Sequence, residues 1–380
     1  MHGVLFMKVY TITFFTIMNK FLLLLGTLFF VACGVKDRAD DVNIIEVSID
    51  NVDTDMAAYS DYKFVRLETN DDCFLENIVK AKVVGNDIYL LSSYGGNIYK
   101  YTIDGEFLWK LSKGLGPDDL VFPTDFYFEP SDSVLYVLDN YRIIKKYTKD
   151  GCYIENFSMD TPSFLFELLD EGYMMFNPNL TSKSNNYLSI YKNDSLVFSK
   201  LPIHENLKNV SFMPSNVFVK IENDSYYIQY MLSDTIYCYN TESNEIKPAF
   251  YIDTRGKSIN SHNIKFSNTR HHDLICEKEN LISGIAGLSV LDNKLYMLMY
   301  YKEKQWYIVY DINSKKTITT NKLCTGIPNS LRCVGRDDDF VVFLYRPEDL
   351  LQHKDEISDK ANNMLMGIKE DDNPILVLLK

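Results

Sequence analysis

The sequence predicts an all-β fold made of repeated antiparallel units, and three observations lead to this prediction. Tyrosine and phenylalanine are abundant, with 27 and 23 copies, while glycine and proline are ordinary in number, which favours strands over disorder. Short alternating apolar runs recur along the chain. Two of them, "YTIDGEFLWK" at 101–110 and "YTKDGCYIEN" at 147–156, place their Asp-Gly turns 46 residues apart.

The strand-like runs fall into repeated units. A run preceded by an acidic or Asn-containing turn occurs six times, at 85–93, 130–140, 169–177, 222–232, 291–301 and 336–346. A second run follows most copies and enters a turn rich in Asp, Asn, Gly or Ser, at 97–105, 143–151, 187–195, 235–243 and 306–314. A further run leaves the turn, so each unit holds four antiparallel strands. This pattern is typical of a β-propeller blade, and a β-sandwich would not give six self-similar units.

The two ends of the chain are expected to complete the sixth unit. A helical insertion is predicted over 347–368, starting near Pro347, and the chain then ends in a lone strand at 373–380. The strand "YKFVRLET" at 62–69 offers the missing partner. Pairing the N-terminal strand with the C-terminal strand would close a six-bladed ring and remove exposed sheet edges. Another insertion is expected at 251–284, between units four and five.

The first 32 residues are predicted to be a signal peptide for export. "MNKFLLLLGTLFFVAC" combines Lys20, an apolar run and Ala32 directly before Cys33, and Met18 is the expected true start. "FVAC" resembles a bacterial lipobox, in which Cys33 would be lipidated and become the mature N-terminus. A plain signal peptide or a membrane anchor is the alternative. The expected organisation is therefore a lipidated tether at 33–60 followed by the propeller at 61–380.

Charge limits the partners that the mature chain can have. Residues 1–32 contain two lysines and no acid, so the rest carries 37 basic and 52 acidic residues, a net charge of −15. Such a balance argues against nucleic acid and against an anionic membrane surface as main partners. Membrane contact is expected only through the N-terminal lipid. The six cysteines after Cys33 show no metal-type spacing, and whether any of them pair stays open.

Several segments together resemble a known family. They are "FVRLET", "KYTIDGEFLWKLSKGLGPDDLVFPTDFYFEPSDSVLYVLD", "PAFYID" and the terminal "DDNPILVLLK". The chain is similar, over about residues 60–380, to the six-bladed, NHL-like β-propeller lipoproteins of Bacteroidota, although "KGLGPDDL" departs slightly from the family's G-x-G-P-G-E run. The resemblance implies a propeller fold and an envelope location, and it leaves the biochemical role open.

Motifs that would indicate catalysis are not found. The chain has no G-x-S-x-G and no H-E-x-x-H, and its only histidine cluster, "TRHHD" at 269–273, is expected to be a polar loop. We predict no catalytic residue, no metal ligand and no cofactor. A structural or catalytic calcium ion is left open, as is the alternative of a hydrolase or lyase with a metal-assisted site in the central channel.

A binding surface is the favoured functional feature. Loops between the second and third strands of each blade share a face with the blade-to-blade connections, and exposed aromatic residues beside arginine are typical of recognition surfaces. We predict a monomeric binding or scaffold module for an envelope protein, peptide or glycan, on an outer-membrane lipoprotein whose leaflet is left open. Packing of these tyrosines between blades is the alternative. The candidate ligand-binding residues are Tyr94, Lys113, Asp118, Tyr141, Arg142, Tyr300, Tyr301 and Arg346.

Overall fold

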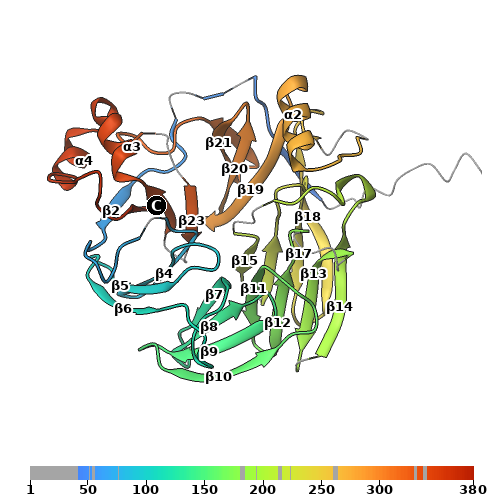
Figure 1. Cartoon of the computed structure of the whole chain (residues 1–380). Coiled ribbons are helices and arrows are strands. Elements are labelled where there is room, and N and C mark those ends of the chain that lie inside the picture. Colours follow the sequence, from blue (N-terminus) through green and yellow to red (C-terminus); the bar gives the residue numbers. More distant parts are fainter. Residues whose placement is uncertain are drawn as a thin grey trace, which may run out of the picture. The chain divides into compact units, whose positions relative to one another are not determined.

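Three sheets each consist of four consecutive strands in antiparallel order (Figure 1). One contains β7 (Pro123–Glu129), β8 (Val134–Asp139), β9 (Ile143–Thr148) and β10 (Tyr153–Ser158). Another contains β11 (Leu165–Leu169), β12 (Gly172–Phe176), β13 (Asn186–Lys192) and β14 (Ser195–Pro202). The third contains β19 (Ile282–Leu291), β20 (Lys294–Tyr301), β21 (Lys304–Asp311) and β22 (Lys316–Thr320). The predicted all-β class and its four-stranded antiparallel sheets are confirmed.

The structure is a computed structural model, and it describes most of the chain after the N-terminal segment. The described residues are 42–380 except 51, 54, 55, 76, 180–184, 194, 213–215, 223, 260–263, 329–331 and 337–339. The predicted signal peptide, Met18 and the lipid attachment at Cys33 lie outside the described residues and stay predictions. None of the helices in the described part has the length and apolar character needed to cross a membrane.

A fourth sheet gains an extra strand from the N-terminal side. It contains β15 (Phe218–Ile221), β16 (Ser225–Ile228), β17 (Thr235–Asn240) and β18 (Glu245–Asp253), and β1 (Asn43–Glu46) pairs with β18 in parallel. Beyond β1, the backbone N–H of Tyr59 donates to the carbonyl of Leu323. The second half of the expected tether is therefore hydrogen-bonded to the sheets, and β1 covers what would otherwise be a free sheet edge.

The remaining strands form one eight-stranded sheet. Their order is β2 (Tyr62–Arg66), β25 (Ile375–Leu379), β24 (Val341–Tyr345), β23 (Arg332–Arg336), β3 (Lys80–Val84), β4 (Asp87–Leu91), β5 (Ile98–Thr102) and β6 (Phe107–Leu111). β2 pairs antiparallel with β25, from Tyr62 opposite Leu379 to Arg66 opposite Ile375, and Figure 1 shows β2 beside the C-terminus. A single residue pair, Gly335 with Ala81, joins β23 to β3, so the sheet consists of two four-stranded halves.

In the part of the chain that the structure describes, the helices lie in the connections between strands. They are η2 (Glu205–Leu207), α2 (Thr269–Glu279), α3 (Pro347–Gln352), η4 (Lys354–Glu356) and α4 (Asp359–Met364). The stretch "TRHHD", expected to be a polar loop, instead begins α2. The Asn268 side chain accepts a hydrogen bond from the His271 backbone N–H and so caps the helix, while His272 is 1% exposed and packs 5.2 Å from the Phe266 ring.

Apolar clusters between neighbouring sheets form the core. Tyr89 of β4 stacks on Phe128 of β7 with ring centroids 4.8 Å apart, and Phe250 of β18 meets Tyr310 of β21 at 5.8 Å. Because the second strands are covered on both faces, they read as continuous apolar runs, and every residue of β24 is buried. This face-to-face packing of four-stranded antiparallel sheets is a β-propeller-like fold.

The two Asp-Gly turns dock onto the outer strands of neighbouring four-stranded groups: the Gly105 turn onto β2, in the other half of the eight-stranded sheet, and the Gly151 turn onto β6. Gly105 has φ +92° and Gly151 has φ +83°, the region that favours glycine. The backbone N–H of Glu68 donates to the Gly105 carbonyl, and a Cβ on Gly105 would lie 1.9 Å from the Arg66 carbonyl oxygen. Beside Gly151, the Trp109 indole N–H of β6 donates to the Lys149 carbonyl. These glycines therefore serve contacts between sheets as well as the local hairpins.

We expect Gly105→Ala to lower the free energy of unfolding by about 3 kcal/mol or more, because it adds a backbone clash to the strain of a positive φ. Gly85→Ala is the matched control. Gly85 also has a positive φ, but nothing lies within 4 Å of its would-be Cβ, so about 1 kcal/mol is expected. Urea unfolding of the two variants measures the difference. Equal losses would show that the contact between the Gly105 turn and β2 contributes nothing.

Candidate functional site

A polar groove of about 810 Å³ lies where the β20–β21 turn approaches the end of β24 and the start of α3. Its volume is within the range of ligand pockets, about 300–1,000 Å³. Three cationic side chains line it, those of Lys304, Arg332 and Arg346, together with the acids Glu303 and Asp349. The amides of Asn77, Gln305 and Asn321 and the indole of Trp306 contribute further polar groups. We call this feature the arginine groove.

The hairpin that forms one wall of the arginine groove turns in an unusual way. Tyr301 pairs with Lys304, so Lys302 and Glu303 form the two-residue turn. Both have positive φ, +50° and +59°, a conformation for which Asn and Gly are the usual choices. The strained turn carries Glu303 at the groove, and strained backbone of this kind often marks functional sites.

Arg332, the first residue of β23, is the half-buried cation of the groove. Its charge acts on two tyrosines whose pKa values are raised mainly by burial. The pKa of Tyr94 is raised to about 12, with the positive charge of Arg332 opposing the shift, and the pKa of Tyr300 is raised in the same manner. No carboxylate among the described residues lies within ion-pair distance of Arg332. In the described part of the chain, the Arg332 guanidinium therefore lines the groove without an ion-pair partner and hydrogen-bonds the Tyr94 side chain.

Two buried polar atoms in the same wall lack hydrogen-bond partners within the described part of the chain. They are the side-chain oxygen Oε1 of Gln305 and the indole Nε1 of Trp306. Buried polar groups without partners are uncommon because desolvating them costs free energy. Gln305 and Trp306 are neighbours on β21, so their side chains lie on opposite faces of the strand, and that of Trp306 packs against an apolar cluster.

Three of the predicted ligand-binding residues lie at or beside the arginine groove. Arg346 lines it, with its side chain 60% exposed and 3.8 Å from Glu348. Tyr300 lies beside the groove, where its hydroxyl interacts with the charge of Arg332 and hydrogen-bonds the Gln305 side chain. Tyr301 packs its ring against Trp306 at 6.3 Å.

Tyr94 and Tyr141 take part mainly in aromatic packing. The Tyr94 ring lies 4.6 Å from that of Phe164, although Tyr94 also interacts with Arg332. Tyr141 lies 6.2 Å from Phe164 and 5.4 Å from Phe122. Of these two tyrosines, Tyr94 is the one that interacts with a residue of the groove, Arg332.

Lys113, Asp118 and Arg142 are not among the residues that line the groove. The backbone N–H of Lys113 donates to the Asn97 side chain, and the carbonyl of Asp118 accepts a hydrogen bond from the Tyr147 hydroxyl. Lys113 and Asp118 have exposed side chains on the β6–β7 connection, and Arg142 is half-buried on the β8–β9 loop.

Sequence reasoning missed Arg332, and a comparison of the repeat units contained a signal for it. The first strand of one unit begins with Lys80 and that of another begins with Arg332. Lys80 has a partner: its Nζ lies 2.5 Å from Oδ1 of Asp125, whose Oδ2 accepts the backbone N–H of Phe166. Burial raises the pKa of Asp125 while Lys80 opposes the shift. The two cations occupy similar positions, but Arg332 lacks such a carboxylate among the described residues.

A second cleft, of about 710 Å³, lies between the β7–β10 and β11–β14 sheets. Its walls include the rings of Tyr136 and Phe157. The Lys146 ammonium lies 5.5 Å from the centroid of each ring and 2.8 Å from a carboxylate oxygen of Glu155. Because Lys146 already occupies these aromatic faces, they do not form an open stacking platform.

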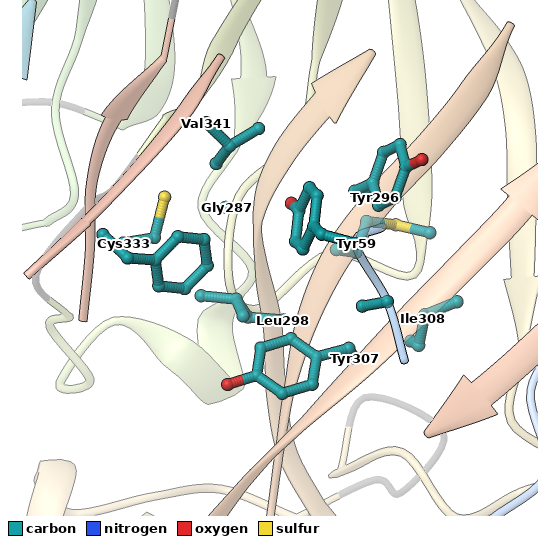
Figure 2. A pocket seen from close by; sticks show the side chains of 11 residues that line it. Tyr59, Gly287, Tyr296, Leu298, Tyr307, Ile308, Cys333 and Val341 are labelled. Atoms are coloured by element: carbon teal, nitrogen blue, oxygen red, sulfur yellow. The ribbon is translucent and has the colours of Figure 1, made fainter. Parts of the chain in front are cut away.

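A small cavity between β20–β21 and β23–β24 is shown in Figure 2. Tyr59 reaches it from the N-terminal segment and stacks on Tyr296 at 4.7 Å, and Cys333 and Tyr307 lie on its other sides. Its volume is about 10 Å³, about the least that can hold one water molecule. The cavity is therefore a feature of packing, and a ligand would not fit in it.

No group of three or more His, Cys, Asp or Glu side chains among the described residues is arranged to hold a metal ion. The described cysteines are all free thiols. A structural or catalytic calcium ion, left open by the sequence, is not tested by these observations.

Comparison with known proteins gives the family of the chain. Residues 42–380 match the family described as a domain of unknown function (DUF4934), and the protein belongs to that family. A Bacteroides fragilis crystal structure described as a "Putative exported protein" is 19% identical, covers 89% of this chain and 99% of its own, and has a TM-score of 0.71. A DUF4221 family member from Bacteroides vulgatus is 10% identical, covers 85% and 97%, and has a TM-score of 0.51. These similarities show the fold alone, and no curated protein matches the chain.

We expect Tyr59→Ala to lower the free energy of unfolding by about 3–5 kcal/mol, because it removes a buried aromatic ring and enlarges the cavity shown in Figure 2. Met56→Ala, in the same segment, is the control, since Met56 is 47% exposed. Chemical denaturation of both variants checks the difference. A loss of less than about 1 kcal/mol for Tyr59→Ala would show that the N-terminal segment is dispensable for stability.

Proposed function

We propose that this protein is a lipid-anchored, extracytoplasmic binding or scaffold module that recognises a partner protein, peptide or glycan of the cell envelope through the arginine groove. The arginine groove is the observation that carries the proposal. A chain with a formal net charge of −13 gathers Lys304, Arg332 and Arg346 around one hollow. Concentrating cations on an acidic protein favours recognition of a specific anionic partner.

The finer architecture that we propose is a closed ring of six blades. Among the described residues, six apolar clusters each lie between two neighbouring groups of strands. One of these clusters joins β2 and β23–β25 to β3–β5, and another joins β2 and β23–β25 to β20–β21. The pairing of β2 with β25 makes the last blade from both ends of the folded region, which supports closure.

Location and anchoring rest on the N-terminal sequence and on one structural relative. The "FVAC" segment ending at Cys33 supports lipidation, and the Bacteroides fragilis relative is described as exported. We propose an outer-membrane lipoprotein in which Cys33 carries the anchor. The alternative of a metal-assisted hydrolase or lyase stays a prediction, because no described contact bears on it.

Affinity capture from native membranes tests the binding role. We expect the tagged full-length protein to retain a reproducible partner, and the double variant Arg332→Gln/Arg346→Gln to lose most of it, because both cations line the groove. Lys113→Gln is the matched control, since Lys113 is an exposed cation away from the groove. If the double variant retains the same partners at the same level, the groove is not the binding site.

Cys33→Ala tests the anchor. The variant should keep its leader or be released from the membrane fraction, because a lipobox cysteine is the attachment point of the lipid. Fractionation with immunoblotting, with Cys152→Ala as an exposed-cysteine control, measures this. Unchanged processing and membrane association of Cys33→Ala would contradict lipidation at this residue.

A further inference from the structure

We infer that the arginine groove binds an extended acidic peptide segment with carboxylates on alternate residues, and that Arg332 is the anchor for one of these carboxylates. The inference rests on the proposed binding function and names its ligand class. Four features of the groove carry it: Arg332 without a counter-ion among the described residues, the tyrosine hydroxyls beside it, the spacing of the two arginines, and the orphaned side-chain oxygen of Gln305.

Three lysines on the sheets form ion pairs with carboxylates, a kind of partner that Arg332 lacks among the described residues. Lys80 pairs with Asp125, Lys100 lies 2.8 Å from an oxygen of Asp87, and Lys145 lies 3.2 Å from one of Asp139. In each case a carboxylate on the same sheet or a neighbouring one compensates the buried charge. Arg332 is half-buried and has no such partner among the described residues. A ligand carboxylate would fill this role, and the planar guanidinium can bind it through two parallel hydrogen bonds.

The phenols near Arg332 suit a carboxylate ligand as well. Tyr94 and Tyr300 both interact with the guanidinium, and both hydroxyls are protonated at neutral pH because burial only raises a tyrosine pKa that is already well above neutral. A protonated phenol can donate a hydrogen bond, whereas an ionised carboxylate can only accept. Donors therefore surround the place where an anionic group would sit.

Strand register gives the spacing between the two arginines. Arg332 pairs with Leu344, and Arg346 lies two residues further along the same strand direction with extended backbone, φ −82° and ψ 141°. Diagonal neighbours of this kind are about 7–8 Å apart. Side chains on alternate residues of an extended peptide are about 7 Å apart. Two acidic residues separated by one residue therefore match the pair Arg332 and Arg346.

The other groups in the wall favour a peptide over a glycan. A peptide unit presents an N–H donor, which matches the orphaned acceptor Gln305 Oε1. Gln305 can turn its amide about a soft terminal torsion to meet the ligand. The Trp306 ring packs against Tyr301 and an apolar cluster, so it does not offer an open face for stacking on a sugar ring.

Binding of defined peptides to the purified full-length protein in detergent tests the inference. The probe is a fluorescent peptide with Glu at alternate positions and Ser between them, followed by fluorescence anisotropy at several salt concentrations. We expect binding that weakens as salt rises. Replacing Glu by Gln in the peptide should weaken binding about tenfold or more. Arg332→Gln should weaken binding about thirtyfold or more, because it removes the half-buried charge.

Two further protein variants keep the test independent of folding. Arg346→Gln changes an exposed side chain and should weaken binding without changing the thermal unfolding temperature. Lys113→Gln should leave binding within about twofold of the wild type, because an exposed charge away from the site contributes little. If Arg332→Gln unfolds, the Arg346→Gln result and the Gln-substituted peptide still decide the outcome.

Three results would overturn the inference. Equal affinity for the Glu and Gln peptides would show that carboxylates are not recognised. Binding of polygalacturonate but not of the Glu peptide, lost in Arg332→Gln, would assign the groove to an anionic glycan. Failure of the Glu peptide to bind, while membrane capture still depends on Arg332 and Arg346, would refute the ligand class and leave the proposed function standing. If the Glu peptide does not bind and membrane capture does not depend on Arg332 and Arg346, the inference and the proposed function are both refuted.

Discussion

The pairing of β2 with β25 is the constraint on which the rest of the structure depends. It brings together strands about 300 residues apart in sequence, from Tyr62 opposite Leu379 to Arg66 opposite Ile375. Two apolar clusters contain residues from both strands, one on each face of this sheet. The Gly105 turn also packs against the Arg66 carbonyl of β2. Without this pairing, β25 would expose a buried apolar edge, and the first Asp-Gly turn would have no surface to dock on.

The cations that begin two of the described strands, Lys80 and Arg332, differ in whether a carboxylate pairs with them. Lys80 on β3 joins Asp125 on β7, and Asp125 in turn accepts a hydrogen bond from the backbone of Phe166 on β11, so this ion pair connects three sheets. Arg332 begins its strand in the same manner as Lys80 but faces the arginine groove. Arg332 hydrogen-bonds the Tyr94 side chain but has no ion-pair partner among the described residues, and a ligand carboxylate would lower the free-energy cost of a half-buried unpaired charge.

Local sequence patterns predicted much of the fold because hairpin turns and strand runs depend on near neighbours. The strand runs on either side of Gly105 and Gly151 are the third and fourth strands of their four-stranded units, as the turn chemistry indicated. "TRHHD" was interpreted wrongly as a polar loop, since the helix is held by contacts that no short window contains, such as the hydrogen bond from the Thr269 hydroxyl to the Ser211 carbonyl. For the same reason Tyr94 and Tyr141 could be placed on loops, but their packing around Phe164 could not be foreseen.

The sequence by itself determined the all-β class and the strands of each unit, and it singled out Arg346, which lines the arginine groove. These depend on alternation and turn propensities, which are local properties of the chain. Tertiary structure alone decided that Arg332 would stand without a carboxylate partner among the described residues, near the hydroxyls of Tyr94 and Tyr300. Tyr94 precedes β5, Tyr300 is the last residue but one of β20 and Arg332 begins β23, so their proximity depends on how distant sheets pack. An arrangement of that kind is set by long-range contacts, and the spacing of residues along the chain does not encode it.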